Sequence, residues 1–464
     1  MKTTILILGA TGDLTKKKLI PAIHNLIKDK KLKDFVIVGA ATSKVSSEVI
    51  LNKSKPHIKN LNKQAWEHLK KRFYYHSTDF YDKKHFCGLE FLIKTLEKKY
   101  NLPGNRLIYL ATLPQHFKII SQNLKDCGLV NKNKSKSWTR VVFEKPFGHN
   151  LNSAKKINNC IKSVFSEKQT YRIDHYLGKE LVQNLNVLRF TNTFLEPIWN
   201  NKYIDHVQII LSENVGIETR GKFYDKYGAL KDVVQNHMLQ MLSLIAMEAP
   251  KKLQENCIRD EKLKILKSIK TTNNIILGQY QGYKNEKGVN KKSNTETFAS
   301  LKLFVNNERW KNVPFYFITG KNMKDKVTTI HIEFKQTKCR LFHKVCNFNP
   351  NHLTLQIQPE EGFHLHINSK VPGKTTIVPV KMDFCHECTF GPNTPEAYEN
   401  LLYDVMKGDQ SVFIRSDEIE QQWKIIDKIE NTKCKIQIYK KGSYPEQAKK
   451  LIEKEGRKWH LEVN

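Results

Sequence analysis

The sequence predicts an α/β domain with a parallel sheet, followed by an α+β domain. In the N-terminal part, short apolar runs rich in β-branched residues alternate with amphipathic segments at helical spacing, which is typical of βαβ units. In the C-terminal part, apolar and polar residues alternate within successive runs, which is typical of half-buried strands. The 464 residues suffice for two cores, and we place the domains at residues 1–175 and 176–464.

The chain opens with a predicted strand, a glycine turn and a helix. Thr4–Leu8 is an apolar run that ends at the turn Gly9–Leu14, and apolar residues then recur at helical spacing. This order directs backbone N–H groups and a helix N-terminus toward a pyrophosphate, and glycine permits an approach that a side chain would block. The G-x-x-G spacing of Gly9 and Gly12 is short, but a second apolar strand at Phe35–Gly39 completes a βαβ unit. The sequence therefore predicts a Rossmann-like dinucleotide-binding domain.

The residues after the second strand indicate which dinucleotide binds. An acidic residue at this position would hold the ribose 2′-hydroxyl of NAD. The chain has Ala40–Lys44 (AATSK) instead, with two hydroxyls, one cation and no carboxylate. Because this segment would accept a 2′-phosphate beside Lys44, we predict NADP as the cofactor.

A nine-residue segment, Arg172–Glu180, combines charges that cannot all be buried unpaired. It reads RIDHYLGKE and holds two cations, a histidine, a phenol and two carboxylates around one glycine. Unpaired buried charge is costly, so the segment is expected to face solvent or a ligand. Histidine, tyrosine and lysine together are the donors that a phosphate monoester needs. The residues fit both a solvated turn and a phosphate-binding segment.

A second polar segment follows the predicted strand Asp205–Leu211. Glu213 and a glycine-punctuated loop lead into a long helix that is predicted from about Ala229 to Glu248. His237 lies beside the apolar stripe of this helix, and Asp232 lies on a different face. The histidine is either a core residue with a satisfied nitrogen or, if a carboxylate orients it, a general base.

Further elements are predicted from the same patterns. The last strand of the first domain is expected at Arg140–Phe143. The second domain is expected to contain later strands at Thr297–Val305, Val313–Gly320, Thr328–Phe334, Leu353–Gln358 and Phe363–Ile367, and C-terminal helices at Thr394–Lys407 and Glu418–Glu430.

Six segments resemble the glucose-6-phosphate dehydrogenase family, in the family's order and over nearly the whole chain. They are GATGDLTKKKLIPAIHNL, VVFEKPFGHNL, YRIDHYLGKELVQNLNVLRF, PIWNNKYIDHVQI, KDVVQNHMLQML and PEAYENLLYDVMKGDQSVFIRSDE. The RIDHYLGKE stretch is close to diagnostic of the family. The resemblance implies an oxidoreductase that transfers hydride from C1 of glucose 6-phosphate to NADP and gives 6-phosphoglucono-1,5-lactone, the first oxidative step of the pentose phosphate pathway.

The resemblance also implies roles for the residues at matching positions. His237 would be the general base for the C1 hydroxyl, and Asp174 the carboxylate that orients it. The implied sugar-phosphate ligands are His175, Tyr176, Lys179 and Lys326, and the implied sugar ligands are Lys145, Glu213, Asp232 and Lys321. The implied cofactor contacts are Gly9, Thr11, Gly12, Asp13, Lys44, Ala111 and Lys145. No metal is expected.

One position departs from the family's pattern. Many members carry an arginine after the second strand that holds the 2′-phosphate, and Thr42 occupies that position here. Lys44 offers a point charge without the bidentate fork of arginine, so NAD stays an alternative to NADP. Two other interpretations are an enzyme that acts on a related hexose phosphate and a decayed relative without activity. The intact His237, Asp174 and Lys179 argue against decay.

The family resemblance further implies that the later strands form a large, mainly antiparallel sheet whose outer face makes a dimer contact. We therefore expect a homodimer or a dimer of dimers.

The net charge of +32 raises the question of nucleic-acid binding. Lysine outnumbers arginine by 67 to 11, and the lysines are spread along the whole chain. A dedicated nucleic-acid binder more often clusters its charge and uses arginine forks. We predict no specific nucleic-acid function, only weak salt-sensitive adhesion.

The nine cysteines are an odd number and mostly isolated, which is typical of reduced thiols in a reducing compartment. Cys385 and Cys388 have the CxxC spacing of zinc sites, with His364 and His366 upstream. Because no second CxxC accompanies them, reduced cysteines are expected and structural zinc is the alternative. No window approaches 18 apolar residues, and the apolar run after Lys2 is too short for a signal peptide, so we expect a cytoplasmic protein without membrane contact.

Overall fold

The computed structural model describes residues 1–130, 136–337, 349–391, 395–432 and 434–461, which form two compact units. The first unit consists of Met1–Gly178, Lys252–Arg259 and Pro395–Glu420. The second consists of Lys179–Lys251, Asp260–Thr394 and Gln421–Asn464. The division of the sequence between residues 175 and 176 stays a prediction.

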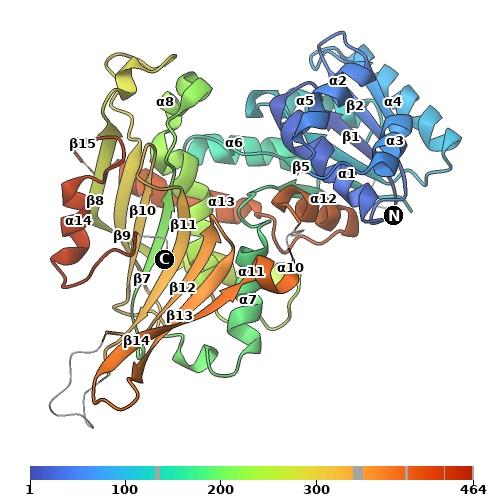
Figure 1. Ribbon diagram of the computed structural model, residues 1–464. Coiled ribbons are helices and arrows are strands. Elements are labelled where there is room, and N and C mark those ends of the chain that lie inside the picture. The colour runs from blue at the N-terminus through green and yellow to red at the C-terminus, as the bar shows by residue number, and fades with distance from the viewer. Residues whose placement is uncertain (131–135, 338–348, 392–394, 433, 462–464) are drawn as a thin grey trace. The chain divides into compact units, whose positions relative to one another are not determined.

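A six-stranded parallel sheet forms the centre of the first unit, with strand order β3-β2-β1-β4-β5-β6. Strands β1, β2 and β5 of this sheet are labelled in Figure 1. Its strands are β1 (Lys2–Leu8), β2 (Asp34–Ala41), β3 (Phe73–Ser77), β4 (Arg106–Leu110), β5 (Thr139–Phe143) and β6 (Thr170–Arg172). The order reverses between β1 and β4, which is the switch point at which a Rossmann sheet binds its ligand. β1, β2 and β4 are buried almost throughout, and accordingly most of their residues are apolar.

Seven α-helices lie wholly within the described part of the first unit. They are α1 (Ile20–Lys28), α2 (Ser47–Ser54), α3 (Lys63–Arg72), α4 (Lys83–Lys99), α5 (Phe117–Asp126), α6 (Leu151–Lys162) and α12 (Ala397–Lys407). Side chains that accept backbone N–H groups mark the starts of α2, α3, α4 and α6, namely Ser46, Asn62, Asp82 and Asn150. The predicted helix Thr394–Lys407 corresponds to α12, and Thr394 lies outside the described residues.

The second unit is built on a nine-stranded sheet with strand order β14-β13-β12-β11-β7-β10-β9-β8-β15. The β10–β7 and β15–β8 pairs are parallel and the other six pairs are antiparallel. The strands are β7 (Ile204–Ser212), β8 (Ile269–Tyr280), β9 (Phe298–Val305), β10 (Pro314–Gly320), β11 (Val327–Phe334), β12 (His352–Gln358), β13 (Gly362–Lys370), β14 (Ile377–Cys385) and β15 (Ile436–Tyr439). The predicted fold class, a Rossmann-like domain plus an α+β domain with a large, mainly antiparallel sheet, is confirmed.

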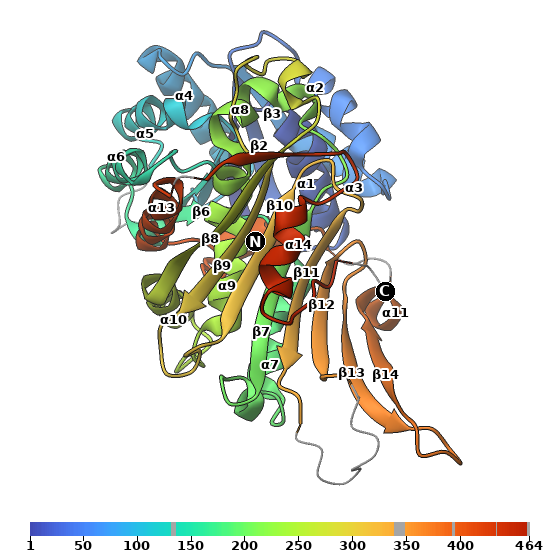
Figure 2. The same ribbon diagram turned by 90° about the vertical axis from the view of Figure 1, so that its left-hand side faces the viewer.

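Helices cover both faces of this sheet. Figure 2 shows α14 (Glu446–Glu453) against one face, while α7 (Glu180–Thr191) packs on the other. The remaining α-helices of this part of the chain are α8 (Gly221–Ala229), α9 (Leu239–Ala246) and α11 (His386–Phe390), together with α10 (Glu255–Ser268) and α13 (Ser416–Glu430), in which the chain passes from one unit to the other.

The long helix predicted from Ala229 to Glu248 differs from the observed structure. A π-helix, Leu230–Met238, lies between α8 and α9. Before it, Gly228 has φ 66° and ψ −178°, which interrupts the helical path. The apolar periodicity indicated the extent of the helical segment, but not the wider turn in its middle.

In the second unit, the strands β8, β14 and β15 were not predicted, and in the first unit the short strands β3 and β6 were not predicted either. In β8 the polar run Thr271–Asn274 interrupts the apolar pattern, and the pairing register shifts there. No residue of β14 is buried, and β15 is a four-residue strand at the sheet edge. The interrupted pattern of β8 and the shortness of β15 explain why these two strands were missed. β14, by contrast, does have apolar residues at every second position, Val378, Val380, Met382 and Phe384, and its pattern was overlooked.

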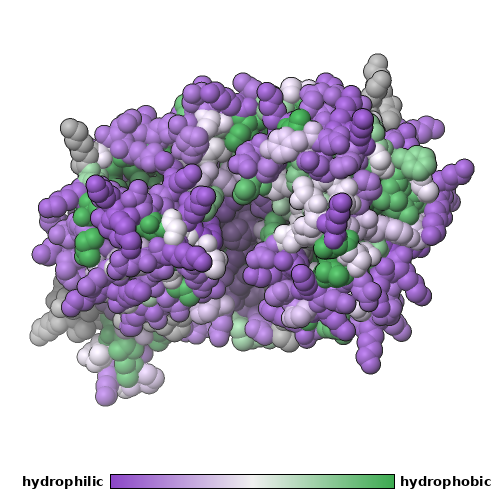
Figure 3. Space-filling model, turned by 90° about the horizontal axis from the view of Figure 1, so that it is seen from above, coloured by the Kyte–Doolittle hydropathy of each residue, from purple (hydrophilic) through white to green (hydrophobic). Residues whose placement is uncertain are grey.

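Hydrophilic side chains cover most of the face shown in Figure 3, and hydrophobic ones appear there as small separate patches. Among the described residues, no helix combines the length and the apolar character needed to cross a membrane.

Candidate active site

The glycine turn lies at the carboxyl end of β1, beside the ends of β2 and β4. Gly9 donates its N–H to Ala40 O at 2.8 Å, and Gly12 donates to Gly9 O at 3.0 Å. Gly9 has φ +96°, and a Cβ added to it would lie 2.4 Å from Ala111 O. Only glycine therefore permits this close turn, which leads directly into a helix at Asp13.

The other predicted cofactor contacts of the first unit surround this turn. Asp13 pairs with Lys16 at 3.1 Å and with Lys17 at 3.4 Å, and hydrogen bonds from these lysines lower its pKa. Ala111 follows β4 directly and donates its N–H to Leu8 O at 2.8 Å. Lys44 lies in an exposed segment after β2. Backbone donors, a helix start and a nearby cation are thus gathered at one end of the sheet, where a dinucleotide phosphate fits.

Lys145 follows Glu144, which belongs to a buried network of hydrogen bonds that was not predicted from the sequence. The neighbouring Glu144 accepts hydrogen bonds from Tyr109 and, at 3.2 Å, from Tyr398. Burial raises the pKa of the Glu144 carboxyl. The peptide bond between Lys145 and Pro146 is cis. The two phenols come from β4 and α12, so no local motif could have indicated them.

The RIDHYLGKE segment leaves β6 and packs against α12 within the first unit. Asp174 is buried and accepts the Tyr176 N–H at 3.0 Å. The rings of His175 and Tyr176 lie 5.0 Å apart, and His175 is partly exposed. A Cβ on Gly178 would lie 2.8 Å from Leu401 Cγ, which explains the glycine at this point of the motif. The segment is thus neither wholly solvated nor wholly buried.

Lys179, the next residue, belongs to the second unit and precedes α7. Its carbonyl accepts the N–H groups of Val182 and Gln183 at 3.1 Å, so it occupies the N-cap position. Glu361, in the turn between β12 and β13, accepts the Leu181 N–H at 3.3 Å. Burial raises the pKa of Glu361, and the charge of Lys179 opposes that rise. Glu361 is a further polar residue that sequence reasoning missed.

Glu213, Lys321 and Lys326 lie at one end of the nine-stranded sheet. β7 pairs parallel with β10 through Ser212 and Gly320, so the residues that follow these strands are neighbours. Lys321 is buried and forms an ion pair with Glu213. Lys326 is exposed and precedes β11, whose first residue pairs with Ser212. The strand register, rather than sequence proximity, brings these three side chains to one edge.

Asp232 and His237 both lie on the π-helix and are both buried. In an α-helix, at about 100° per residue, a separation of five residues leaves two side chains about 140° apart. A π-helix with about 4.4 residues per turn reduces this angle to about 50°. The wider turn therefore places the carboxylate and the imidazole on nearly the same face of the helix.

Two further residues lie near Lys321 and Asp232: Arg220, which directly precedes α8, and Tyr224, which lies on α8. Lys321 Nζ lies 5.6 Å from the centre of the Tyr224 ring, and Arg220 pairs with Asp232 at 3.4 Å. Burial, together with the charge of Asp232, raises the pKa of Tyr224 well above its usual value. Tyr224 therefore stays a neutral phenol beside the charged groups. Neither residue was predicted, since a single tyrosine or arginine carries no distinguishing sequence pattern.

The prediction of reduced cysteines is wrong for four of the seven cysteines that the structure describes; Cys339 and Cys346 lie outside the described residues. Disulfide bonds join Cys87 to Cys127 and Cys385 to Cys388, with Cα atoms 5.0 and 5.2 Å apart. The Cys385–Cys388 pair is thus bonded to itself, which removes the thiolates that a zinc site needs. The first pair is separated by 40 residues in sequence and is brought together by the fold.

The fold and these clusters define a two-domain protein of the Rossmann type, with a dinucleotide turn in one unit and a polar sheet edge in the other. Residues 6–184 match the NAD binding domain of glucose-6-phosphate dehydrogenase, and residues 186–460 match the C-terminal domain of the same enzyme. The chain therefore belongs to the glucose-6-phosphate dehydrogenase family.

Individual relatives are similar to this chain over nearly its full length. The glucose-6-phosphate 1-dehydrogenase of Chlamydia pneumoniae is 42% identical over 98% of this chain and 95% of the relative. The Bacillus subtilis enzyme is 40% identical over 99% of this chain and 98% of the relative. A solved structure of glucose-6-phosphate dehydrogenase in complex with its substrate glucose 6-phosphate has a TM-score of 0.92 and 33% identity, covering 99% of this chain and 98% of that one. The structure of the Mycobacterium avium enzyme has a TM-score of 0.86 and 32% identity, with complete coverage of both chains.

Proposed function

We propose that this protein oxidises glucose 6-phosphate at C1 and passes the hydride to NADP. The product is 6-phosphoglucono-1,5-lactone, and the reaction is the first oxidative step of the pentose phosphate pathway. The observation that carries this proposal is the similarity of both units to one enzyme family over nearly the whole chain. The family resemblance seen in the sequence is thereby confirmed, and the protein is a nicotinamide-dependent glucose-6-phosphate dehydrogenase.

The glycine turn of the first unit supports the cofactor assignment. A Cβ at Gly9 would fill the space beside Ala111, whereas the turn offers backbone donors next to a helix start. When it is bound there, the nicotinamide supplies hydride acceptance. Thr11, Gly12 and Asp13 would contact the pyrophosphate side, and Lys145 would approach both cofactor and sugar.

We assign the proton transfer to His237. Oxidation of the C1 hydroxyl releases one hydride and one proton, so a single base near neutral pH suffices. Asp174 would orient the imidazole and stabilise its protonated form, as the carboxylate does in other His–Asp pairs. The buried position of His237, on a helix that also carries Asp232, supports a role that needs a fixed orientation.

The phosphate and the sugar hydroxyls are assigned to the remaining predicted residues. A cation and neutral donors suit a phosphate dianion, and the proposed phosphate ligands are His175, Tyr176, Lys179 and Lys326. The proposed ligands of the sugar hydroxyls are Glu213, Asp232 and Lys321, two of which form an ion pair that a hydroxyl can join. Phosphate binding far from C1 fixes the reacting hydroxyl against the base.

The preference for NADP over NAD is a separate part of the proposal. No carboxylate follows β2, and the exposed Thr42, Ser43 and Lys44 would accept a 2′-phosphate. Because Thr42 replaces the arginine of many family members, we expect NAD to be used as well, at a lower rate. We also propose a homodimer or dimer of dimers, which light scattering on the purified protein tests, and a cytoplasmic location.

The test is the rate of nicotinamide reduction by purified protein, measured with glucose 6-phosphate and with glucose, each with NADP and with NAD. Reduction that requires the phosphate supports the proposal, and the ratio of the two cofactor rates measures the effect of Thr42. Folded protein that reduces neither cofactor would contradict the proposed activity.

A further inference from the structure

A group of histidines lies on one face of the nine-stranded sheet, apart from the residues assigned above. Side chains two residues apart on a strand point to the same face, and paired residues on adjacent strands are neighbours. The register of β7, β11, β12 and β13 thus forms two adjacent rows on that face. One row is His206, Glu333, His352 and His366, and the other is Gln208, His331, Thr354 and His364.

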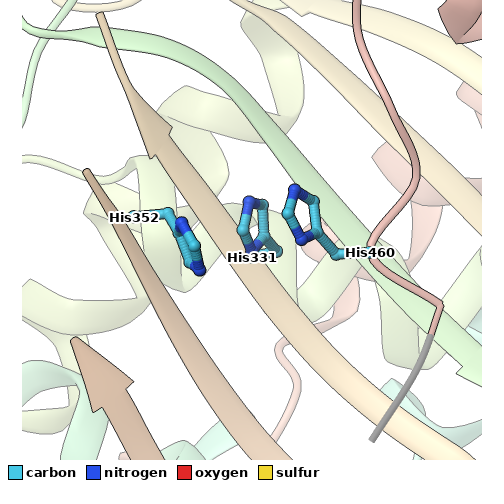
Figure 4. Close-up of side chains that lie close together, drawn as sticks. All are labelled: His331, His352 and His460. Carbon is cyan, nitrogen blue, oxygen red and sulfur yellow. The ribbon is translucent and has the colours of Figure 1, made fainter. Parts of the chain in front are cut away.

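A further histidine reaches this face from the C-terminal segment. The ring of His331 lies between those of His352 and His460 (Figure 4). Its centroid is 3.6 Å from that of His460, with the rings stacked, and 4.8 Å from that of His352. One ring nitrogen from each of the three residues lies within 4.8 Å of the nitrogens of the other two. Three residues distant in sequence therefore offer three potential ligand atoms at one place.

His331 holds a buried nitrogen that lacks a hydrogen-bond partner among the described residues. Its side chain is completely buried, and Nδ1 lies 2.9 Å from Thr354 Oγ1, which sets the orientation of the ring. No described atom forms a hydrogen bond with Nε2. The carboxylate Oε2 of Glu333 is 3.6 Å from it, beyond hydrogen-bond range. A buried polar atom in this state indicates a missing partner.

The distances from the Glu333 carboxylate to two of these ring nitrogens are close to those in a tetrahedral metal site. An imidazole binds a metal in its own plane, so the partly exposed His460 ring would turn out of its stack with His331 on binding. Zinc bonds of about 2.0–2.1 Å place neighbouring ligand atoms about 3.3 Å apart. Glu333 Oε2 lies 3.3 Å from His460 Nε2 and 3.6 Å from His331 Nε2, which is close to this spacing. We propose that His331, His352 and His460, with Glu333 as the carboxylate ligand, bind one divalent transition-metal ion of the zinc class. Four protein ligands close the coordination shell, so the ion has a structural role.

The site would attach the C-terminal segment to the sheet. Arg457 already pairs with Asp205 at 2.7 Å, and the N–H of His460 donates to Gln208 Oε1 at 3.0 Å. A metal ion would add a bond from His460 to β11 and β12. A pocket of about 280 Å³, lined by residues that include His352, His366 and His460, provides an entry path. His331 lies five positions after Lys326, which directly precedes β11, a distance of about 16 Å along the strand, so the site is distinct from the proposed sugar-phosphate ligands.

The test uses full-length protein without a histidine tag, freed of metal by a chelator and dialysis. Co²⁺ is added first, because a tetrahedral Co²⁺ site has strong visible absorption bands, and Zn²⁺ is then added to displace it. The His352→Gln and His460→Gln variants remove one ligand each from partly exposed positions. His57→Gln, at an exposed histidine outside the group, is the matched control.

We expect one Co²⁺ per chain with tetrahedral bands, displacement by Zn²⁺, and at least tenfold weaker binding in both ligand variants but not in the control. Binding that both folded ligand variants retain, bands of thiolate ligation, or no binding at all would overturn the proposal. A measurement on unmutated protein needs no variant to fold: Zn²⁺ should slow trypsin cleavage after Arg457 and Lys458 several-fold. An unchanged cleavage rate would contradict the attachment of the C-terminal segment by the ion.

Discussion

Gly228→Ala tests how the chain holds the helix that carries Asp232 and His237. Gly228 has φ 66° and ψ −178°, a conformation that is open to glycine almost alone. A Cβ at this position would lie 2.3 Å from Oε1 of Glu296. That same oxygen accepts the N–H of Leu230, the first residue of the π-helix, at 3.0 Å. The substitution therefore strains the backbone and displaces the acceptor at the start of the helix.

The expected loss of stability is the sum of the backbone strain and the cost of the displaced acceptor. The backbone conformation costs an alanine about 1–3 kcal/mol. Loss of the acceptor for a buried N–H adds about 1–3 kcal/mol. The free energy of unfolding should thus fall by about 2–6 kcal/mol, a large part of the 5–15 kcal/mol that is typical of a domain. Because the helix carries the proposed base, turnover of the folded variant should fall as well.

Urea unfolding followed by circular dichroism measures the loss of stability, and steady-state kinetics below the transition measure turnover. Gly282→Ala is the matched control, because Gly282 has φ +90° but no atom within 4 Å of the added Cβ. The control should lose only the backbone contribution of about 1–2 kcal/mol and keep its turnover. A loss at Gly228 no larger than the loss at Gly282 would refute the reasoning.

Two further predictions address the site, and a third addresses the buried carboxyl of Glu296. His237→Asn should lower kcat with glucose 6-phosphate by about 10²–10⁴-fold with little change in KM, because the base acts in the chemical step; turnover near that of the unmutated protein would contradict this role. Lys179→Ala should raise KM for glucose 6-phosphate more than it lowers kcat, since a phosphate contact mainly contributes binding, and an unchanged KM would exclude the contact. Burial raises the pKa of Glu296 to about 7, from 4.5 in the unfolded chain. The folded state therefore binds more protons between these values, and the unmutated protein should lose up to about 3 kcal/mol of stability as pH rises through them. Glu296→Gln should lack this loss in melting experiments across that pH range, and equal pH slopes of the two proteins would disprove the assignment.

The start of the first unit was predictable because its elements are defined locally. An apolar run, a glycine turn and an amphipathic helix each have a pattern within a few residues, and the predicted strand Phe35–Gly39 lies within β2. The later strands β9 to β13 were also predicted to within a few residues, since each is a short apolar or alternating run of the sequence. The order of the nine strands, by contrast, depends on pairings between distant segments that no single run encodes.

In the candidate site, too, the residues were predictable from local sequence, whereas their arrangement was not. The sequence indicated Glu213, Asp232, His237 and Lys321 as residues of interest, but it described the helix as continuous. The π-helix, which turns Asp232 and His237 toward one face, depends on the backbone of Gly228 and on a carboxylate 68 residues away in sequence. Likewise, the Lys321–Glu213 ion pair follows from the parallel pairing of β7 with β10.

The sequence by itself determined the Rossmann-like start, the place of the dinucleotide turn, the class of chemistry and the family, because motifs and periodicity are local properties of the chain. Only the tertiary structure decided that Glu144 bonds to Tyr398, that Cys87 pairs with Cys127, and that His331 meets His460. These contacts join residues between 40 and 254 positions apart. Sheet register and helix packing bring such residues together, and both arise from the burial of apolar surface over the whole chain rather than from any short segment of it.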